Sequence, residues 1–244
     1  MIEAGTATRV RVVGIGCHPG QLTAEAREAI AGCDYVIAAD KGPADPLLAL
    51  RRAICAELGV ELVAVADPPR DRDDPADYDG AVLDWHDARA AAYGTVIASR
   101  PGTVGFLVWG DPAFYDSTIR VVDRLRVEYD VLPGVSALSL LAARHRVVLH
   151  EVGRPVLVTT GRRLADEVAA GHDNLVVMLD GRLQCAELDG EWEIWWGANL
   201  GSPHEELVAG PLASVVGDIR AARARAKELD GWVMDTYLLR RREV

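Results

Sequence analysis

The stretch VGFLVWGDPAFYDST, residues 104–118, decides the fold class predicted for this chain. Val104 to Trp109 is a short apolar run rich in β-forming residues, long enough for one buried strand. Gly110 and Pro112 end this strand, because glycine reaches backbone angles closed to other residues and proline lacks a main-chain donor. N-cap residues and apolar residues at helical spacing come next: Asp116, Ser117 and Thr118, then Ile119, Val122 and Leu125. The stretch therefore predicts a strand, a sharp turn and a helix.

This turn is the first place to look for a functional site. In α/β proteins, ligands bind where strands end and helices begin. An ordinary strand-to-helix loop would use the same glycine and proline only to make its turn, so the stretch alone leaves both interpretations open.

The composition fits an ordinary globular α/β protein. The 244 residues suit one large or two small domains, and half of them are hydrophobic, with few aromatic residues. No apolar run approaches about 18 residues, the length expected of a membrane-spanning helix. The first residues lack a basic region followed by an apolar stretch, so we expect a cytoplasmic protein.

Cysteine spacing and charge exclude several function classes. The four cysteines, Cys17, Cys33, Cys55 and Cys185, show no CxxC spacing and predict buried reduced thiols rather than disulfides or a metal site. The net charge of −11 argues against general binding to nucleic acids, which requires phosphate neutralisation. An anionic small molecule held by local arginines stays compatible with that charge.

The order of elements predicts two α/β domains. Strands expected at 9–15, 34–39, 61–66, 104–109 and 129–132 alternate with helices, a pattern typical of a parallel sheet. The polar segment HEVGRP at 150–155 breaks this pattern, so we predict domains at 1–150 and 151–244. Strands expected at 156–160, 175–179, 191–200 and 232–239, with a long helix over 212–229, predict a mixed sheet in the second domain.

Six strand ends carry small or acidic residues at which a ligand could approach the backbone: Gly14 to Gly20, Asp40, Gly110 to Asp111, Pro133 to Ala137, Met178 to Gly181 and Gly197 to Pro203. So many such turns in one chain predict a shared cleft between the two domains. The first turn, Gly14-x-Gly16-x-x-x-Gly20, has the wrong spacing for the dinucleotide fingerprint, which argues against a nicotinamide dehydrogenase.

Several segments resemble those of the tetrapyrrole (precorrin) C-methyltransferases. They are GIGCHPGQLT at 14–23, WGDPAFYDST at 109–118, PGVSAL at 133–138 and VVMLDG at 176–181. Further segments resemble members that methylate C1 of precorrin-5 and release acetate, giving precorrin-6A in aerobic cobalamin biosynthesis. These are AADKG at 38–42, DWHDARAA at 84–91, LAARHR at 141–146, TTGRR at 159–163 and GWVMDTYLLRR at 231–241.

The resemblance implies a homodimeric methyltransferase with S-adenosyl-L-methionine bound in a cleft between two α/β domains, and it implies no metal. The cofactor-binding residues that it implies are Pro19, Trp109, Gly110, Asp111, Phe114, Ser117, Thr118, Ser136, Ala137, Met178 and Gly210. Asp111 suits this role, because a carboxylate accepts hydrogen bonds from ribose hydroxyls or pairs with an ammonium group.

Loss of acetate requires an activated water and a stabilised oxyanion. The candidate catalytic residues are Asp40, Tyr115 and His86, for which a turn aspartate, a structural tyrosine and a packing histidine are the alternatives. A substrate with many carboxylates needs cationic partners. The candidates are Arg70, Arg72, Arg144, His145, Arg146, Arg162 and Arg163, whereas residues 240–242 are expected to form a charged tail.

Two positions depart from the family pattern. Trp109 stands where the family turn has its first glycine, and Gln21 stands where an acid usually follows the N-terminal Pro-Gly. Two other functions stay open. One is a precorrin C-methyltransferase that removes no acetyl group, and the other is a non-catalytic module that binds a tetrapyrrole or the cofactor.

Overall fold

The computed structural model describes residues 8–42, 45–69 and 78–242 of the chain. Its contacts divide the chain into two compact units, Met1–Val135 and Ser136–Val244. The division comes before the boundary expected near residue 150, because helix α5 (Ala137–His145) packs on strands of the second unit. Within the described ranges, no helix is long and apolar enough to cross a membrane.

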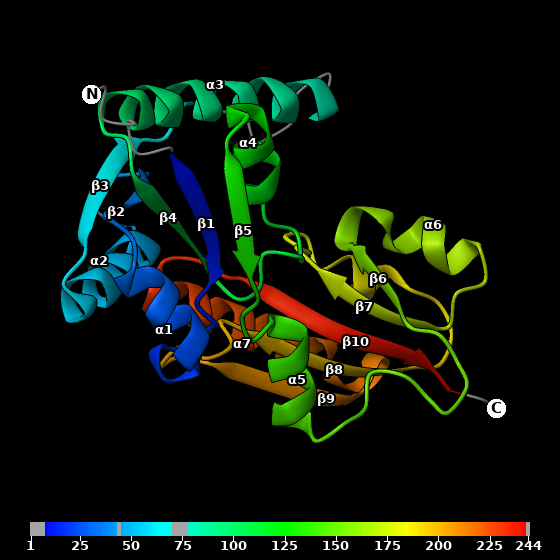
Figure 1. Cartoon of the computed structure of the whole chain (residues 1–244). Coiled ribbons are helices and arrows are strands. Elements are labelled where there is room, and N and C mark those ends of the chain that lie inside the picture. The colour runs from blue at the N-terminus through cyan, green and yellow to red at the C-terminus, as the bar shows by residue number, and fades with distance from the viewer. Residues whose placement is uncertain (1–7, 43–44, 70–77, 243–244) are drawn as a thin grey trace, which may run out of the picture. The chain divides into compact units, whose positions relative to one another are not determined.

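The first unit is built on one parallel sheet. Its strands are β1 (Arg9–Gly14), β2 (Tyr35–Asp40), β3 (Glu61–Ala66), β4 (Thr103–Val108) and β5 (Glu128–Leu132). They lie in the order β3-β2-β4-β1-β5 (Figure 1), and every neighbouring pair is parallel. The predicted parallel α/β sheet is therefore confirmed.

Helices cover both faces of this sheet. Side chains of α1 (Ala24–Ala31) and α2 (Pro46–Leu58) pack with Val13, Val36 and Leu107 in one cluster. Side chains of α3 (Tyr78–Ser99) and α4 (Thr118–Leu125) pack with Val12 and Phe106 in another. Successive strand residues alternate between the two clusters, as the two-residue period of a strand requires.

The strand order creates a crevice position at the carboxyl ends of β1 and β4. From β1 the chain passes through α1 to β2, and from β4 it passes through α4 to β5. These two connections run in opposite directions along the sheet. In open α/β sheets, ligands bind where the connections of two neighbouring strands diverge in this way. The turns that follow β1 and β4 are therefore the expected site of the first unit.

Three backbones come unusually close together at these strand ends. A Cβ placed on Gly134 would lie 2.2 Å from the carbonyl oxygen of Gly110 and 2.8 Å from the carbonyl carbon of Gly14. A Cβ placed on Gly14 would lie 2.5 Å from the nitrogen of Gly134. We call Gly14, Gly110 and Gly134 the glycine junction. The absence of side chains at Gly14 and Gly134 therefore allows the ends of β4, β1 and β5 to meet in this way.

The second unit has a mixed sheet, as predicted. Its strands are β6 (Leu157–Thr160), β7 (Asn174–Met178), β8 (Trp192–Ala198), β9 (Glu206–Pro211) and β10 (Asp235–Arg241), in the order β6-β7-β10-β8-β9 (Figure 1). Only β6 and β7 pair in parallel. Its other helical segments are η2 (Gly161–Arg163), α6 (Leu164–Ala169), η3 (Gln184–Glu187) and α7 (Leu212–Asp230). Strand β9 was not expected from the sequence.

Aromatic residues fill the core of this unit. Trp192, Trp196 and Tyr237 are almost completely buried, and they share one cluster with Ile219 of α7. Arg240 and Arg241 belong to β10, so the expectation of a charged tail is wrong for these two residues. Their guanidinium carbons lie 5.3 Å and 4.6 Å from the ring centres of Trp195 and Trp192, which gives these arginines stacking partners.

Replacing a residue of the glycine junction tests this close packing. Gly134→Ala should lower the free energy of unfolding by about 1–3 kcal/mol, because the added methyl group meets backbone that cannot rotate away. Gly217→Ala is the control, since a Cβ there meets nothing within 4 Å inside helix α7, and it should raise stability by up to about 1 kcal/mol. Urea denaturation measures both, and equal stability changes in the two variants would contradict the junction.

Candidate functional site

The turn after β1 is tied to the turn after β4 by main-chain hydrogen bonds. Gly16 N donates to Gly110 O at 3.2 Å, and Gly110 N donates to Gly16 O at 2.9 Å. Gly16 has a φ of 70° and faces the Gln21 side chain closely, so a side chain is excluded there. The two glycine-rich turns at the crevice position are therefore joined directly to each other.

Gln21 supplies the acceptor that its position requires. Its Oε1 accepts a hydrogen bond from the main-chain N of Cys17 at 2.8 Å. An amide oxygen can do this as a carboxylate oxygen would. The absence of the family's usual acid at this position therefore leaves this turn with an acceptor but without the negative charge.

His18 has a role that the sequence analysis missed. Its Nδ1 accepts a hydrogen bond from Gly20 N at 2.9 Å, which caps the short helical turn η1 (Pro19–Gln21). Because Nδ1 accepts, the neutral ring carries its proton on Nε2. His18, Pro19 and Gly20 are exposed, so the tip of this turn is open to a ligand.

Asp111 joins the turn after β4 to the turn after β5. Its Oδ1 accepts from Ala113 N at 2.8 Å, and its Oδ2 accepts from Gly134 N at 2.9 Å. Each carboxylate oxygen offers two acceptor directions, so a ligand hydroxyl or ammonium group can still bind. Asp111 thus orders the site in addition to any contact that it makes with a ligand.

The other predicted residues of these turns lie close by along the chain. Trp109, Phe114, Ser117 and Thr118 are partly exposed. Ser117 is the N-cap residue of α4 but its side chain makes no cap hydrogen bond, whereas Asp116 Oδ1 accepts from Thr118 N at 2.6 Å. Ser136 is buried, and its Oγ accepts from Ser139 N at 3.1 Å, which starts helix α5 at Ala137. Ser136 therefore has a structural role as a cap.

The three catalytic candidates differ in exposure. Asp40 ends β2 at the same edge of the sheet, and its Oδ1 accepts from Gly42 N at 2.9 Å. Tyr115 is 44% exposed and has a φ of 51°, a strained value for a side chain of this size. His86 is 2% exposed within α3, so its ring is enclosed by protein, and the packing alternative is favoured over direct contact with a substrate.

Two partly buried cations near these turns were not expected from the sequence. Arg51 Nε donates to Leu107 O at 2.8 Å, just before the turn that follows β4, and burial lowers the pKa of its guanidinium. Arg89 Nε lies 2.6 Å from Asp67 Oδ1, and its guanidinium carbon lies 4.0 Å from the ring centre of Trp85. These long side chains anchor helices α2 and α3 to the sheet, and no local sequence pattern distinguishes them from surface arginines.

The turn after β7 is the candidate site of the second unit. Met178 is half-buried, Leu179 is exposed and has a φ of 56°, and Asp180 is 1% exposed. Asp180 Oδ2 accepts from Tyr237 Oη at 2.6 Å, and burial raises the pKa of Tyr237 well above its usual value, so this hydroxyl keeps its proton. Gly210 has a φ of 143° in β9, three strands away from β7 and therefore about 14 Å from Met178 or more.

The predicted substrate-binding cations of the second unit are mostly paired. Arg144 Nε lies 2.6 Å from Glu205 Oε1, and Arg163 Nη2 lies 3.2 Å from Glu167 Oε1. His145 Nε2 donates to Trp196 O at 2.9 Å, and burial lowers the pKa of the imidazole, which favours its neutral form.

The remaining candidates fall into two groups. Arg146 ends α5 in an exposed left-handed position, and Arg162 is exposed in η2 directly after β6. Because β6 and β7 are parallel neighbours, Arg162 and Arg163 lie at the same sheet edge as Met178. Arg70 and Arg72 lie outside the described residues.

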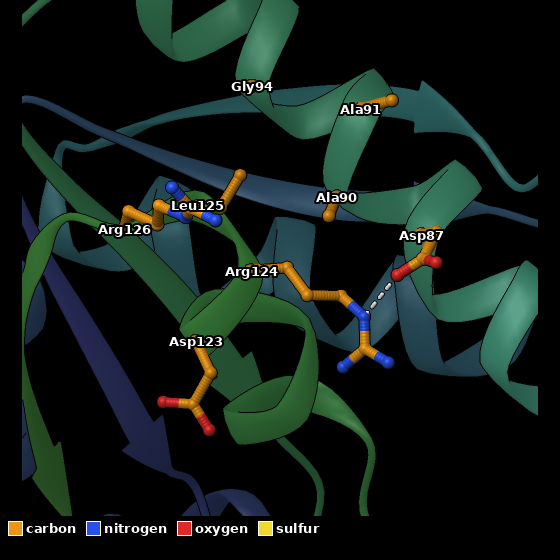
Figure 2. Close-up of a pocket in the computed structure, with 8 residues that line it drawn as sticks. All are labelled: Asp87, Ala90, Ala91, Gly94, Asp123, Arg124, Leu125 and Arg126. Atoms are coloured by element: carbon orange, nitrogen blue, oxygen red, sulfur yellow. Dashed lines mark hydrogen bonds and ion pairs between the residues drawn. The ribbon is translucent and has the colours of Figure 1, made fainter.

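A cavity of about 660 Å³ lies elsewhere in the first unit (Figure 2). Ala90, Ala91 and Gly94 of α3 line one side, and the carboxyl end of α4 lines the other. Arg124 of α4 and Asp87 of α3 form an ion pair there. None of the candidate site residues that the structure describes lines it, and the end of α4 lies away from the turn that follows β4, so this cavity is distinct from the candidate site.

The bridging role of Asp111 predicts a stability change that needs no ligand. Asp111→Asn should lower the free energy of unfolding by about 1–3 kcal/mol. The reason is that the side-chain NH2 group of asparagine would face a main-chain N–H donor and could not accept its hydrogen bond. Asp130→Asn is the control, since Asp130 forms a solvent-exposed ion pair with Arg9, and loss of such a pair should change the free energy of unfolding little. Denaturation of the ligand-free proteins measures both, and an unchanged stability of Asp111→Asn would contradict the bridge.

Comparison with known proteins gives the same family as the resemblance. The family described as Tetrapyrrole (Corrin/Porphyrin) Methylases matches residues 9–216. A precorrin-6A synthase [deacetylating] from Sinorhizobium sp is 40% identical over 257 residues, covering 99% of this chain and 98% of that protein.

Solved structures agree with this result. The crystal structure of a putative cobalamin synthesis related protein (CobF) from Corynebacterium diphtheriae is 33% identical, with a TM-score of 0.83, and the match covers 97% of this chain and all of that one. A uroporphyrin-III-C-methyltransferase from Thermus thermophilus shares the fold at 20% identity, with a TM-score of 0.62 and coverage of 96% and 92%. With the family match spanning most of the chain and the relatives spanning nearly all of it, this chain belongs to the tetrapyrrole (corrin/porphyrin) methylases.

Proposed function

We propose that this chain is an S-adenosyl-L-methionine-dependent methyltransferase that methylates C1 of precorrin-5 and releases acetate, giving precorrin-6A. The observation that carries the proposal is the joined turns at the glycine junction, in a chain 40% identical over nearly its whole length to a precorrin-6A synthase [deacetylating]. We also propose that it acts as a cytoplasmic homodimer in cobalamin biosynthesis.

The described residues fit the proposed cofactor. In the first unit, the turns present exposed Pro19, half-buried Trp109 and the Asp111 carboxylate, which suit an amino acid and a ribose. In the second unit, half-buried Met178 and exposed Leu179 offer apolar surface that suits an adenine ring. When bound, S-adenosyl-L-methionine supplies an activated methyl group on a good leaving group.

The chain's own residues then act mainly by positioning. Holding two reacting atoms in line is worth up to roughly 7–11 kcal/mol in favourable cases, so methyl transfer to an electron-rich ring carbon needs little further help. The glycine junction and the Asp111 bridge serve this purpose, because they fix the turns before a ligand arrives. Exposed Arg146, Arg162 and Arg163 are the proposed partners of the substrate carboxylates.

Loss of acetate requires more from side chains. Water adds to the acetyl carbonyl carbon, the bond from that carbon to the macrocycle breaks, and the macrocycle keeps the electron pair and takes up a proton. Asp40 is the proposed base for the water, because its carboxylate lies at the carboxyl edge of the sheet beside β4. Tyr115 is the proposed donor to the carbonyl oxygen, since it is exposed in the turn after β4.

Mass spectrometry of the product tests the proposed reaction. Purified protein is incubated with S-adenosyl-L-methionine and enzymatically generated precorrin-5. The proposal predicts a product that gains one methyl group and loses its acetyl group, together with one free acetate for each methyl transferred. A methylated product that keeps the acetyl group would identify a different precorrin methylase. Cofactor binding without any product would favour a non-catalytic module.

The proposed role of Asp40 predicts a change in the ratio of the two products. Asp40→Asn should lower acetate release at least about 100-fold while methyl transfer changes only a few-fold, because general base catalysis contributes to the hydrolytic step alone. Asp34→Asn is the matched control, since Asp34 also accepts a main-chain bond, from Thr103 N at 2.7 Å, but lies before β2 at the opposite edge. An unchanged ratio of acetate to methyl transfer in Asp40→Asn would exclude this role.

A further inference from the structure

The turn Met178–Gly181, which follows β7, is held in a strained conformation. Leu179 has a φ of 56°, although it is not a glycine, and 54% of its side chain is exposed. A non-glycine residue in this region costs about 1–3 kcal/mol, and such strain persists only where surrounding contacts enforce it. Burial of the leucine side chain does not provide this enforcement, so other residues must hold the turn.

Buried Tyr237 of β10 and partly exposed Arg223 of α7 hold it. Tyr237 of β10 donates through Oη to Asp180 Oδ2 at 2.6 Å. Arg223 of α7 donates from Nη1 to Asp180 O at 2.8 Å and from Nη2 to Gly181 O at 3.0 Å. The residue directly after Leu179 is therefore fixed through both its side chain and its carbonyl group.

Arg223 is itself oriented by a buried acid. Its Nη1 lies 2.5 Å from Asp235 Oδ2, which also accepts from Trp196 Nε1 at 3.3 Å. Burial is the main cause that raises the pKa of Asp235 to about 6, so below neutral pH this contact weakens as the carboxyl group takes up a proton. We call Asp180, Tyr237, Arg223 and Asp235 the turn clamp.

The clamp contains a polar atom that packing alone does not account for. Asp180 Oδ1 is buried and accepts no hydrogen bond from the described part of the chain. It lies 2.5 Å from the position that a Cβ on Gly161 would take, so the end of β6 packs directly against it. A buried oxygen without a partner costs about 1–3 kcal/mol. A carboxylate kept at this cost, beside a strained turn at a strand end, points to a role in holding the turn for a ligand.

We propose that Tyr237 and Arg223 are positioning residues that hold the Met178–Gly181 turn in the conformation that binds the adenine of the cofactor. This inference rests on the proposed function, which assigns Met178 to that contact. Neither residue needs to touch the cofactor, because Tyr237 is fully buried and acts through Asp180, whereas Leu179 and Met178 present the surface. A clamp that only stabilises the fold would change stability and leave cofactor affinity unaltered.

Calorimetric titration with S-adenosylhomocysteine tests the inference on the full chain. Tyr237→Phe keeps the ring and removes only the hydroxyl group, so the protein should stay folded and its Kd should rise at least 5-fold. The kcat for methyl transfer at saturating S-adenosyl-L-methionine should stay within 2-fold while the KM for that cofactor rises, because the reacting atoms lie elsewhere. Loss of the clamp should thus appear as a change in KM rather than in kcat.

Tyr129→Phe is the matched control. The Tyr129 hydroxyl also donates to an aspartate, Asp123 Oδ1, at 2.6 Å, but it lies on β5 of the first unit. This control should leave the Kd within 2-fold of the parent value. Arg223→Lys is the second variant, because lysine keeps the charge but cannot reach two carbonyl groups in parallel, and its Kd should also rise at least 5-fold. If Tyr237→Phe does not fold, the Kd of Arg223→Lys tests the inference in its place.

Two results would overturn the inference. In one, folded Tyr237→Phe or folded Arg223→Lys binds S-adenosylhomocysteine as tightly as the parent protein. In the other, Tyr129→Phe weakens binding as much as Tyr237→Phe does. A parent protein that does not bind S-adenosylhomocysteine would contradict the proposed function itself, and the positioning role would fall with it.

Discussion

The close approach of three backbones at Gly14, Gly110 and Gly134 is the constraint on which the first unit depends. These glycines end or follow β1, β4 and β5, so the ends of three neighbouring strands meet where the helical connections diverge. A side chain at Gly14 or Gly134 would meet the backbone of the neighbouring turns, and two hydrogen bonds between Gly16 and Gly110 join the turns after β1 and β4. Asp111 then closes the arrangement by accepting from Gly134 N. The site is therefore ordered by main-chain packing, which leaves its exposed residues available to a ligand.

The second unit orders its candidate turn by a different physical means. Here a strained residue, Leu179, is held by buried or partly buried ionic and hydroxyl groups instead of by glycines. Such groups are costly to bury, and they are retained where their hydrogen bonds are nearly complete or where they serve a function. Both units thus fix a turn at the carboxyl end of a parallel strand, one by the absence of side chains and the other by a network of them.

Local sequence patterns predicted the parallel strands, the mixed second sheet and the glycine turns, because each carries a signal within a few residues. Partners distant in sequence carry no such signal. The burial of His86 and the bridge from Asp111 to Gly134 follow from tertiary packing alone. Strand β9 was missed because it contains Gly210 and Pro211, residue types that are unfavourable in strands. The resemblance to known sequences supplied the cofactor and the substrate, which no pattern in one chain could provide.

Hydrogen exchange of the main-chain amides, measured with and without S-adenosylhomocysteine, tests the location of the site most directly. We expect protection concentrated in residues 14–21, 109–114, 133–137 and 176–181, with the amides of α3 and α4 around the 660 Å³ cavity unchanged. Protection confined to residues 87–94 and 123–126, or none in the glycine turns, would contradict it.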